Sequence, residues 1–188
     1  KPTNDKFKVL ELGCGAGANI SFFQHLKANY YATEGSSSIV NYLVKKYPSL
    51  IENIKVADFT KEIPFDMVFD LIIDRAAVTH NTTQAIKNCI SLISKYLKPG
   101  GIFIGIDWFS TAHTEFNNGV FVEDANTKDN FPKGQFHQVG QVHFSDKQHI
   151  RELFMGFEFI QLEHKIVSQE FPESDSQVAT WNFAIKKI

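Results

Sequence analysis

The sequence of 188 residues predicts an α/β protein with a doubly wound, mostly parallel sheet of seven strands and helices on both faces. Strand-like apolar runs alternate with helix-like periodicities from residue 7 to residue 107, which favours a parallel sheet. A glycine-rich turn joins the first strand to the first helix. The last two strands follow each other without a helix between them, which predicts an antiparallel hairpin at the C-terminal edge.

The first half of the chain is expected to supply most of the sheet. Apolar runs predict strands at 7–12, 29–33, 54–57, 68–73 and 102–107. Apolar residues at helical spacing predict helices at 17–28, 36–47 and 83–97. The run Ser36-Ser37-Ser38 offers capping residues for the second helix, and Pro48 ends it. The turn 98–101, Lys-Pro-Gly-Gly, is expected to end the third helix.

Residues 108–143 break this rhythm, because they are polar and aromatic without a clear period. A segment of this length in a compact domain is typically functional, so we expect an inserted lid. The final helix is expected from Ser145, where Ser145-x-x-Gln148 has the form of a capping box, to near Gly156. The closing strands are expected at 157–167 and 177–187, residues 1–6 as a polar lead-in, and residues 1–188 as a single domain.

Composition narrows the class of protein. The formal net charge of -2 argues against a general nucleic-acid binder, and no nucleic-acid partner is expected. The only two cysteines, Cys14 and Cys89, are too few for a disulfide framework, which favours a reducing, cytoplasmic location. No apolar run approaches the roughly 20 residues of a membrane span. No signal peptide is visible, so no membrane association is expected.

The most informative stretch is Glu11-Leu12-Gly13-Cys14-Gly15-Ala16-Gly17. Glycines lack a Cβ, so the backbone can turn sharply there and a ligand can approach it closely. A dinucleotide fingerprint has the spacing G-x-G-x-x-G, whereas these glycines alternate and follow an acid. The stretch resembles the first motif of class I S-adenosylmethionine-dependent methyltransferases, E/D-x-G-x-G-x-G. Residues 69–75 and 98–101 resemble the fourth-strand motif of that family and its link into strand five.

The resemblance implies a Rossmann-like methyltransferase fold with S-adenosylmethionine as the cofactor. Glu34 ends the second strand, where a carboxylate can accept hydrogen bonds from both ribose hydroxyls. After the third strand, the resemblance puts Asp58 beside the adenine amine and Phe59 on the adenine face. Ligands of open α/β sheets lie beyond the carboxyl ends of the strands, so Asp74 and Arg75 are expected near the methyl donor; the alternative for Arg75 is a surface ion pair. The implied cofactor-binding residues are Glu11, Gly13, Cys14, Gly15, Gly17, Asn19, Glu34, Gly35, Asp58, Phe59, Asp74 and Arg75.

Two histidines are expected to serve in catalysis. His80 lies just beyond strand four, and its ordinary pKa suits a general base; the alternative is that it braces the following helix. His113 lies in 108–143 with His137 and His143, whose spacing matches no metal motif, so no metal is expected. Aromatic residues of this segment either line an acceptor pocket or hold the segment in place: Trp108, Phe109, Phe116, Phe121, Phe131 and Phe136.

The function expected from the resemblance is methyl transfer from S-adenosylmethionine to a small-molecule acceptor, at oxygen or nitrogen, by in-line displacement. The segment 108–143 would then be a lid on the acceptor side. Three alternatives stay open: a non-catalytic subunit that binds S-adenosylmethionine, an NAD-dependent oxidoreductase, and a methyltransferase acting on RNA or protein. The fourth strand lacks Asn/Asp-Pro-Pro-Tyr/Phe, which is typical of enzymes that methylate nucleobase amines, and this argues against DNA.

Overall fold

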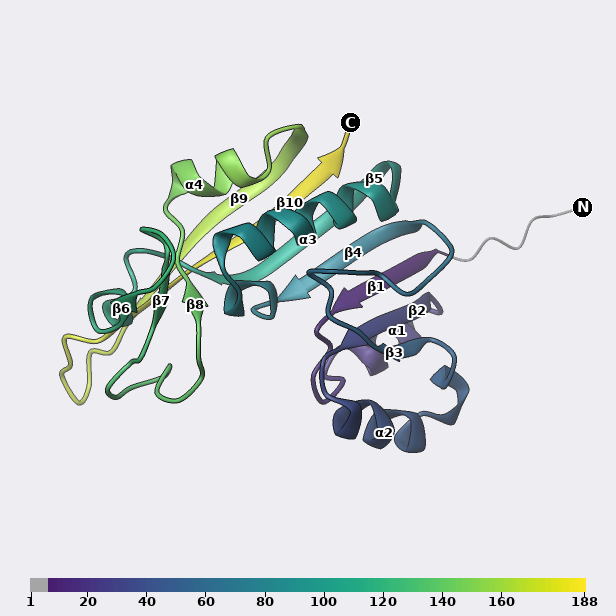
Figure 1. Ribbon diagram of the computed structural model, residues 1–188, viewed down its shortest axis with the longest axis horizontal. Coiled ribbons are helices and arrows are strands. Elements are labelled where there is room, and N and C mark those ends of the chain that lie inside the picture. The colour runs from purple at the N-terminus through teal and green to yellow at the C-terminus, as the bar shows by residue number, and fades with distance from the viewer. Residues whose placement is uncertain (1–6) are drawn as a thin grey trace, which may run out of the picture.

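The computed structural model describes residues 7–188 and contains the predicted seven-stranded sheet, in the order β3-β2-β1-β4-β5-β10-β9 (Figure 1). The lead-in expected at 1–6 lies outside the described residues. The strands of this sheet are β1 Lys8–Leu12, β2 Asn29–Glu34, β3 Ile54–Val56, β4 Phe69–Arg75, β5 Leu97–Phe109, β9 Phe157–Ser168 and β10 Gln177–Lys187. Strand β10 runs antiparallel to β5 and β9, while β1 to β5 pair in parallel. The predicted fold class is confirmed.

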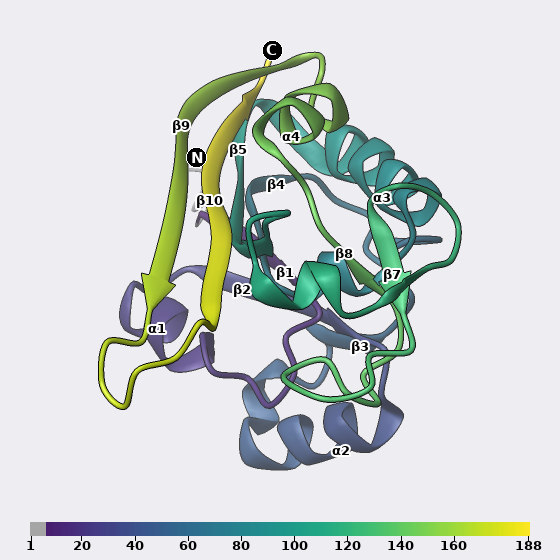
Figure 2. The ribbon, with the colours of Figure 1, turned by 90° about the vertical axis from the view of Figure 1, so that its left-hand side faces the viewer.

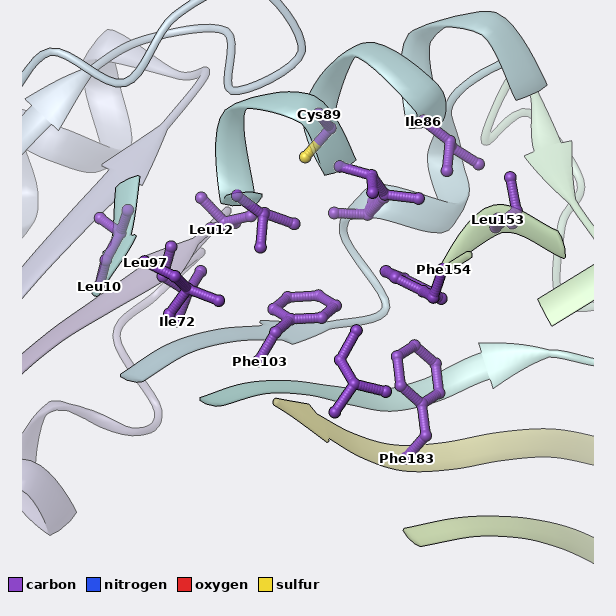
Figure 3. Packing of buried hydrophobic residues seen from close by; sticks show 14 of the residues in the cluster. Leu10, Leu12, Ile72, Ile86, Cys89, Leu97, Phe103, Leu153, Phe154 and Phe183 are labelled. Carbon is purple, nitrogen blue, oxygen red and sulfur yellow. The ribbon is translucent and has the colours of Figure 1, made fainter. Parts of the chain in front are cut away.

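Helices cover both faces of this sheet (Figure 2). One face carries α1 Ile20–His25 and α2 Ser37–Lys46, and the other carries α3 Thr83–Tyr96 and α4 Lys147–Leu153. Successive strand residues point to opposite faces, so Val9 packs in the cluster under α1 and α2, and Leu10 in the cluster under α3 and α4. Figure 3 shows the second cluster, where Cys89 of α3 lies over Phe103 of the sheet. Burial on both faces explains why the strands are continuous apolar runs.

The segment between β5 and α4 forms a second, small sheet beyond the carboxyl ends of the parallel strands (Figure 1). Its strands, in the order β6-β7-β8, are β6 Val120–Phe121, β7 Thr127–Asp129 and β8 Val142–His143. Its own core consists of Phe109, Phe131, Phe136, Val142 and Phe144. The rings of Phe109 and Phe136 lie 4.7 Å apart, so aromatic residues do hold this segment in place. Trp108 belongs instead to the main core, where it is fully buried.

Three predicted boundaries were wrong for identifiable reasons, the first two of them at α4 and β5. Helix α4 is capped by Asp146, whose Oδ1 accepts from His149 N at 2.7 Å, and not by Ser145. The first helical residue is Lys147, so Ser145 lies one position before the cap, where its backbone N–H donates to Phe109 O at 2.9 Å in a strand-like pairing. Strand β5 begins at Leu97, so the expected turn 98–101 lies within the strand as an irregularity in its pairing with β4.

Helix α1 is also shorter than the expected 17–28, because the residues before Ile20 remain in the glycine turn. Three short 3-10 helices complete the described chain: η1 Pro48–Leu50, η2 Val78–His80 and η3 Thr114–Asn117. Across residues 7–188, no helix has the length and apolar character needed to span a membrane.

Candidate active site

The three glycines of the turn after β1 serve different purposes. Gly13, Gly15 and Gly17 have φ values of 63°, 50° and 79°, a region that side chains disfavour. A Cβ on Gly13 would lie 2.4 Å from the Cβ of Ala77, and one on Gly17 would lie 2.6 Å from Cδ1 of Ile20. A Cβ on Gly15 would meet no atom within 4 Å beyond its chain neighbours. Gly13 and Gly17 therefore permit close packing, whereas Gly15 borders open space.

Glu34, at the end of β2, is bonded to this turn. Its Oε2 accepts a hydrogen bond from Gly15 N at 2.9 Å, and its Oε1 accepts one from Ser36 N at 2.9 Å. Gly35 lies between Glu34 and Ser36 on this loop. No atom lies within 4 Å of the position that a Cβ on Gly35 would take. The structure thus brings together the glycine turn and the acid that follows the second strand.

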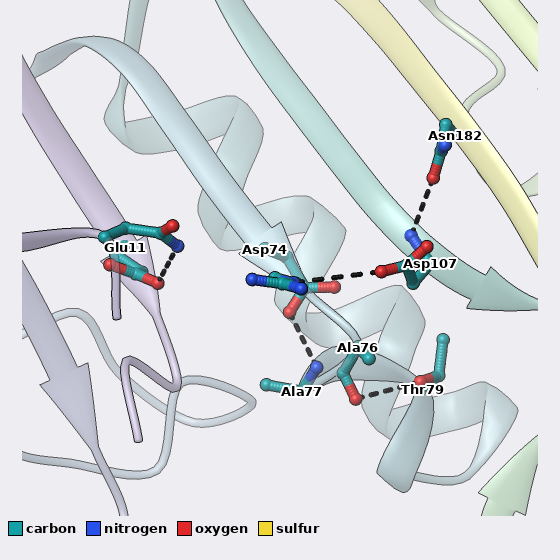
Figure 4. Close-up of polar contacts among 9 residues, drawn as sticks. Glu11, Asp74, Ala76, Ala77, Thr79, Asp107 and Asn182 are labelled. Atoms are coloured by element: carbon teal, nitrogen blue, oxygen red, sulfur yellow. Dashed lines mark hydrogen bonds and ion pairs between the residues drawn. The ribbon is translucent and has the colours of Figure 1, made fainter. Parts of the chain in front are cut away.

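Glu11 forms a buried polar cluster at the carboxyl end of β1 (Figure 4). Its Oε1 accepts from Asn19 Nδ2 at 2.8 Å, and its Oε2 accepts from the hydroxyl of Tyr30. Burial raises the pKa of Glu11 above its ordinary value, although both hydrogen bonds oppose the shift. Burial, with the charges of Glu11 and Glu34, raises the pKa of the Cys14 thiol to about 12. Cys14 is therefore a neutral thiol at physiological pH.

Asp58 and Phe59 follow β3 and approach the same turn. A Cβ on Gly13 would lie 3.3 Å from Cε1 of Phe59, so this ring packs against the backbone of the turn. Asp58 accepts from Thr60 N at 3.0 Å and Thr60 Oγ1 at 2.6 Å, and lies 2.8 Å from Lys61 Nζ. Burial opposes ionisation of Asp58, but these donors and the Lys61 charge outweigh it and hold its pKa below the ordinary value.

Asp74 points inward from the end of β4 and is fully buried (Figure 4). Its Oδ1 accepts from Ala77 N and Val78 N, both at 3.0 Å, and its Oδ2 accepts from Trp108 Nε1 at 2.7 Å. Burial raises the pKa of Asp74 to about 7, against the effect of these three donors. The carboxylate therefore holds the turn between β4 and η2 in place from its buried side.

Arg75 and Asp107 stand side by side at the ends of β4 and β5. Arg75 Nε lies 3.8 Å from Asp107 Oδ2, with side chains 55% and 33% exposed. Asp107 N donates to Asn182 Oδ1 at 2.8 Å (Figure 4). Ala76 and Asp107 both have φ of 56°, which is uncommon outside glycine. Such backbone conformations are typical of functional sites, so these two strand ends are of special interest.

A cavity of about 340 Å³ lies between these strand ends and the hairpin of β9 and β10. Its lining residues are Ala76, Asp107, Phe109, Gln135, Lys165, Val167, Val178 and Thr180. Ala76 precedes Ala77, the residue packed against Gly13, so the cavity lies next to the glycine turn. Ligands of open α/β sheets bind at this carboxyl edge of the strands.

His80 and His113 are absent from this lining, but both pack against it. Their ring centroids lie 5.7 Å and 6.2 Å from that of Phe109. Burial lowers the pKa of both histidines, so both are neutral at physiological pH. Within residues 7–188, His80 Nδ1 and His113 Nε2 are buried atoms without a hydrogen-bond partner. His113 Nδ1 accepts from Glu115 N at 3.1 Å, so Nε2 of the neutral ring carries the proton and can only donate, whereas His80 Nδ1 has no such contact.

The other histidines of the segment 108–143 have internal partners. His137 Nδ1 lies 2.9 Å from Phe131 O, and His143 Nε2 lies 3.2 Å from His149 Nε2. Among the described residues, no group of three or more His, Cys, Asp or Glu side chains is arranged to hold a metal ion.

Sequence analysis missed four polar residues of the cavity: Asp107, Gln135, Lys165 and Thr180. Asp107 carried a usable signal, because it ends the predicted strand 102–107 on the ligand side of the sheet. Lys165 and Thr180 lie inside strands and face each other across the β9–β10 pair. Their presence in the lining depends on the register of this hairpin.

Fold and site together define a cofactor-dependent transferase on a Rossmann-like sheet. Residues 9–101 match the family described as a methyltransferase domain, from β1 into β5. The chain belongs to the class I S-adenosylmethionine-dependent methyltransferases; it is an enzyme, and its cofactor is S-adenosylmethionine. No curated protein matches the sequence.

Solved structures show the same fold at low sequence identity. An S-adenosylmethionine-dependent methyltransferase from Methanosarcina mazei has a TM-score of 0.72 and 16% identity, covering 97% of this chain and 93% of its own. A protein from Pyrococcus horikoshii has a TM-score of 0.71 and 15% identity, covering 100% and 84%. A glycopeptide N-methyltransferase in complex with S-adenosylhomocysteine has a TM-score of 0.65 and 14% identity, covering 97% and 82%.

Proposed function

We propose that the enzyme methylates a small-molecule acceptor, at oxygen or nitrogen, by in-line displacement. The observation that carries this proposal is the cavity of about 340 Å³ beside the glycine turn. Small-ligand sites typically measure roughly 300–1,000 Å³ and combine apolar walls with a few polar groups. The segment 108–143 contributes Phe109 from its start and Gln135 from its last third, so we assign it as the lid on the acceptor side.

We assign the ribose and adenine contacts to residues at the ends of β2 and β3. We expect Glu34 to accept hydrogen bonds from ribose hydroxyls; the open space at Gly35 beside it supports this assignment. Phe59 offers an apolar face next to Gly13. Asp58 has a lowered pKa, so it stays an ionised acceptor suited to the adenine amine.

We assign the amino-acid end of the cofactor to the turn and its neighbours. Gly15 borders open space that a side chain would fill, which fits close approach of a ligand to the backbone. The remaining residues of this group are Glu11, Gly13, Cys14, Gly17 and Asn19, and the Glu11–Asn19 hydrogen bond orients them. Asp74 supports the site through the Ala77 and Val78 N–H groups, and Arg75 adds a cation at its edge.

When bound, S-adenosylmethionine supplies a methyl group already activated on a sulfonium. The chain then has to align the acceptor with that group and exclude water. We expect Phe109 and the apolar walls formed by Val167 and Val178 to exclude water. For a hydroxyl acceptor, His80 would act as the general base, because it is neutral and its Nδ1 has no partner in the described chain. His113 would assist by donating a hydrogen bond through Nε2, since its Nδ1 accepts from Glu115 N.

A labelled-methyl assay tests this proposal. The enzyme is incubated with methyl-labelled cofactor and, separately, with the small-molecule, protein and RNA fractions of a cell extract. We expect label in the small-molecule fraction, and loss of it in Val178→Trp, which fills the cavity. Ile166→Trp is the matched control, because Ile166 is a half-exposed residue of β9 outside the cavity lining. Label confined to protein or RNA would overturn the proposal.

A further inference from the structure

Two side chains of opposite charge line the acceptor cavity from different walls. Asp107 comes from the end of β5, and Lys165 comes from β9 opposite Thr180 of β10. Within the described chain, Lys165 has no ion-pair partner within 4.0 Å, and Asp107 pairs only with Arg75. The charged atoms of Asp107 and Lys165 are therefore more than 4.0 Å apart and form no ion pair with each other.

The carboxylate of Asp107 is held in place by its backbone. Its N–H is bonded to Asn182 Oδ1 at 2.8 Å, and its φ of 56° turns the chain at the cavity mouth. The contact with Arg75 Nε is long, at 3.8 Å, and exposed, and such pairs contribute little. A ligand can therefore compete for this carboxylate, and Oδ1 takes no part in the Arg75 contact.

The lining holds no neutral base. Its polar side chains are Asp107, Gln135, Lys165 and Thr180, while His80 and His113 lie outside it. A hydroxyl acceptor needs a base to remove its proton in the transition state, whereas an amine brings its own electron pair. A carboxylate suffices to orient an amine, because it accepts hydrogen bonds from the N–H groups and leaves the lone pair free.

We infer that the acceptor is a zwitterion with an apolar body, whose amine is held by Asp107 and whose anionic group is held by Lys165. This inference rests on the proposed function, because it assigns the acceptor of the same cavity. The amine loses one proton to water and then donates its electron pair to the new N–C bond. The electron pair of the broken S–C bond stays on sulfur, so the products are a methylammonium ion, S-adenosylhomocysteine and the released proton.

Four matched compounds test this inference: L-phenylalanine, 2-phenylethylamine, 3-phenylpropionate and L-phenyllactate. They share a phenyl body and differ in carrying both charges, the amine alone, the acid alone, or a hydroxyl in place of the amine. Release of S-adenosylhomocysteine measures turnover, and calorimetry measures binding to the enzyme saturated with S-adenosylhomocysteine. We expect L-phenylalanine to bind tightest of the four and to be methylated, and L-phenyllactate to bind without turnover.

Substitutions of Asp107 and Lys165 test which charged group of the acceptor each of them binds. Asn tolerates positive φ, so Asp107→Asn keeps the strand end intact and should lower kcat/KM for L-phenylalanine about tenfold or more. Lys165→Met should raise KM about tenfold with kcat little changed, since a lost charged hydrogen bond costs about that much. Lys95→Met, which removes an exposed cation at the far end of α3, is the control for net charge. All three variants should bind S-adenosylhomocysteine as the wild type does.

The outcomes separate the two proposals. Methylation of L-phenyllactate in preference to L-phenylalanine would overturn the zwitterion while leaving small-molecule methylation standing. Methylation of L-phenylalanine at the wild-type rate by Asp107→Asn and Lys165→Met would also overturn the zwitterion and leave small-molecule methylation standing. Absence of both binding and turnover for all four compounds would overturn the inference, and label confined to protein or RNA in the fraction assay would overturn the proposed function itself.

Discussion

Gly15 N donates a hydrogen bond to Glu34 Oε2 at 2.9 Å, which joins the turn after β1 to the end of β2. The two residues are 19 positions apart in the sequence. The second oxygen of Glu34 is held by Ser36 N, so the carboxylate has a fixed position before any ligand arrives. A fixed partner lowers the entropic cost of binding, and the site is in this respect pre-organised.

Glu34→Ala should weaken binding of S-adenosylhomocysteine by about tenfold or more, because hydrogen bonds to a charged group are worth about 1.5–3 kcal/mol. Titration calorimetry measures this change. Glu52→Ala is the control, since the Glu52 side chain is 83% exposed in a turn before β3. Unchanged affinity in Glu34→Ala would remove Glu34 from the cofactor site.

Substitution of two glycines should separate binding from folding. Gly15→Val points into open space, so the protein should fold, with a modest loss of stability from φ of 50°, and should lose cofactor binding. Gly17→Val should lower Tm further, because its Cβ would meet Ile20 and Leu43 at 2.6 Å and 2.8 Å. Thermal unfolding with and without S-adenosylhomocysteine distinguishes the two. A normal ligand-induced Tm shift in Gly15→Val would contradict the assignment.

Features that depend on neighbouring residues were predictable from the sequence. The glycine turn combines local spacing with a strand and a helix on either side, and Glu34 simply ends the next strand. The meeting of Gly13 with Phe59 follows once the strands are parallel, because their carboxyl ends share an edge.

Features that depend on long-range pairing were not predictable. Lys165 reaches the acceptor cavity only because β9 pairs with β10 in one register, opposite Thr180. Asp74 is fully buried, and one of its hydrogen-bond donors, Trp108 Nε1, comes from 34 residues later in the sequence. Ser145 also belongs to a long-range pairing, with Phe109, and the capping position of α4 falls on Asp146, one residue later than expected.

Ionisation of Asp74 should lower the free energy of unfolding as the pH rises. Its pKa is raised from 3.8 to about 7 in the folded protein, so the folded state binds more protons than the unfolded state between these values. The stabilisation is complete below pH 3.8 and is lost as the pH rises through about 7. The slope attributable to this group is at most about 1.4 kcal/mol per pH unit.

Urea unfolding of the wild type and Asp74→Asn across this pH range measures that slope. The variant should lack it, and should also be destabilised by about 1–3 kcal/mol, because its amide NH₂ faces a backbone or Trp108 donor. Asp70→Asn is a useful comparison, since the pKa of Asp70 is lowered and its slope should have the opposite sign. Parallel pH profiles for the wild type and Asp74→Asn would contradict the prediction.

The histidine pair that joins the lid to α4 should make the protein acid-labile. His143 is fully buried on β8, with Nε2 3.2 Å from His149 Nε2 and Nδ1 near the hydroxyls of Thr83 and Thr127. Burial, together with the charge of His149, lowers the pKa of His143 from 6.5 to about 3. The unfolded state therefore binds more protons below pH 6.5, and stability present above that value is lost as the pH falls through about 3.

His143→Gln should flatten the pH dependence of the unfolding free energy over this window, because glutamine keeps hydrogen-bonding capacity and does not titrate. Denaturant unfolding at a series of pH values measures the slope, and amide hydrogen exchange of β6 to β8 shows whether the lid opens first. His137→Gln is the matched control, since His137 is an exposed histidine of the same segment. An unchanged slope in His143→Gln would contradict the prediction, because burial of the ring is the cause of its lowered pKa.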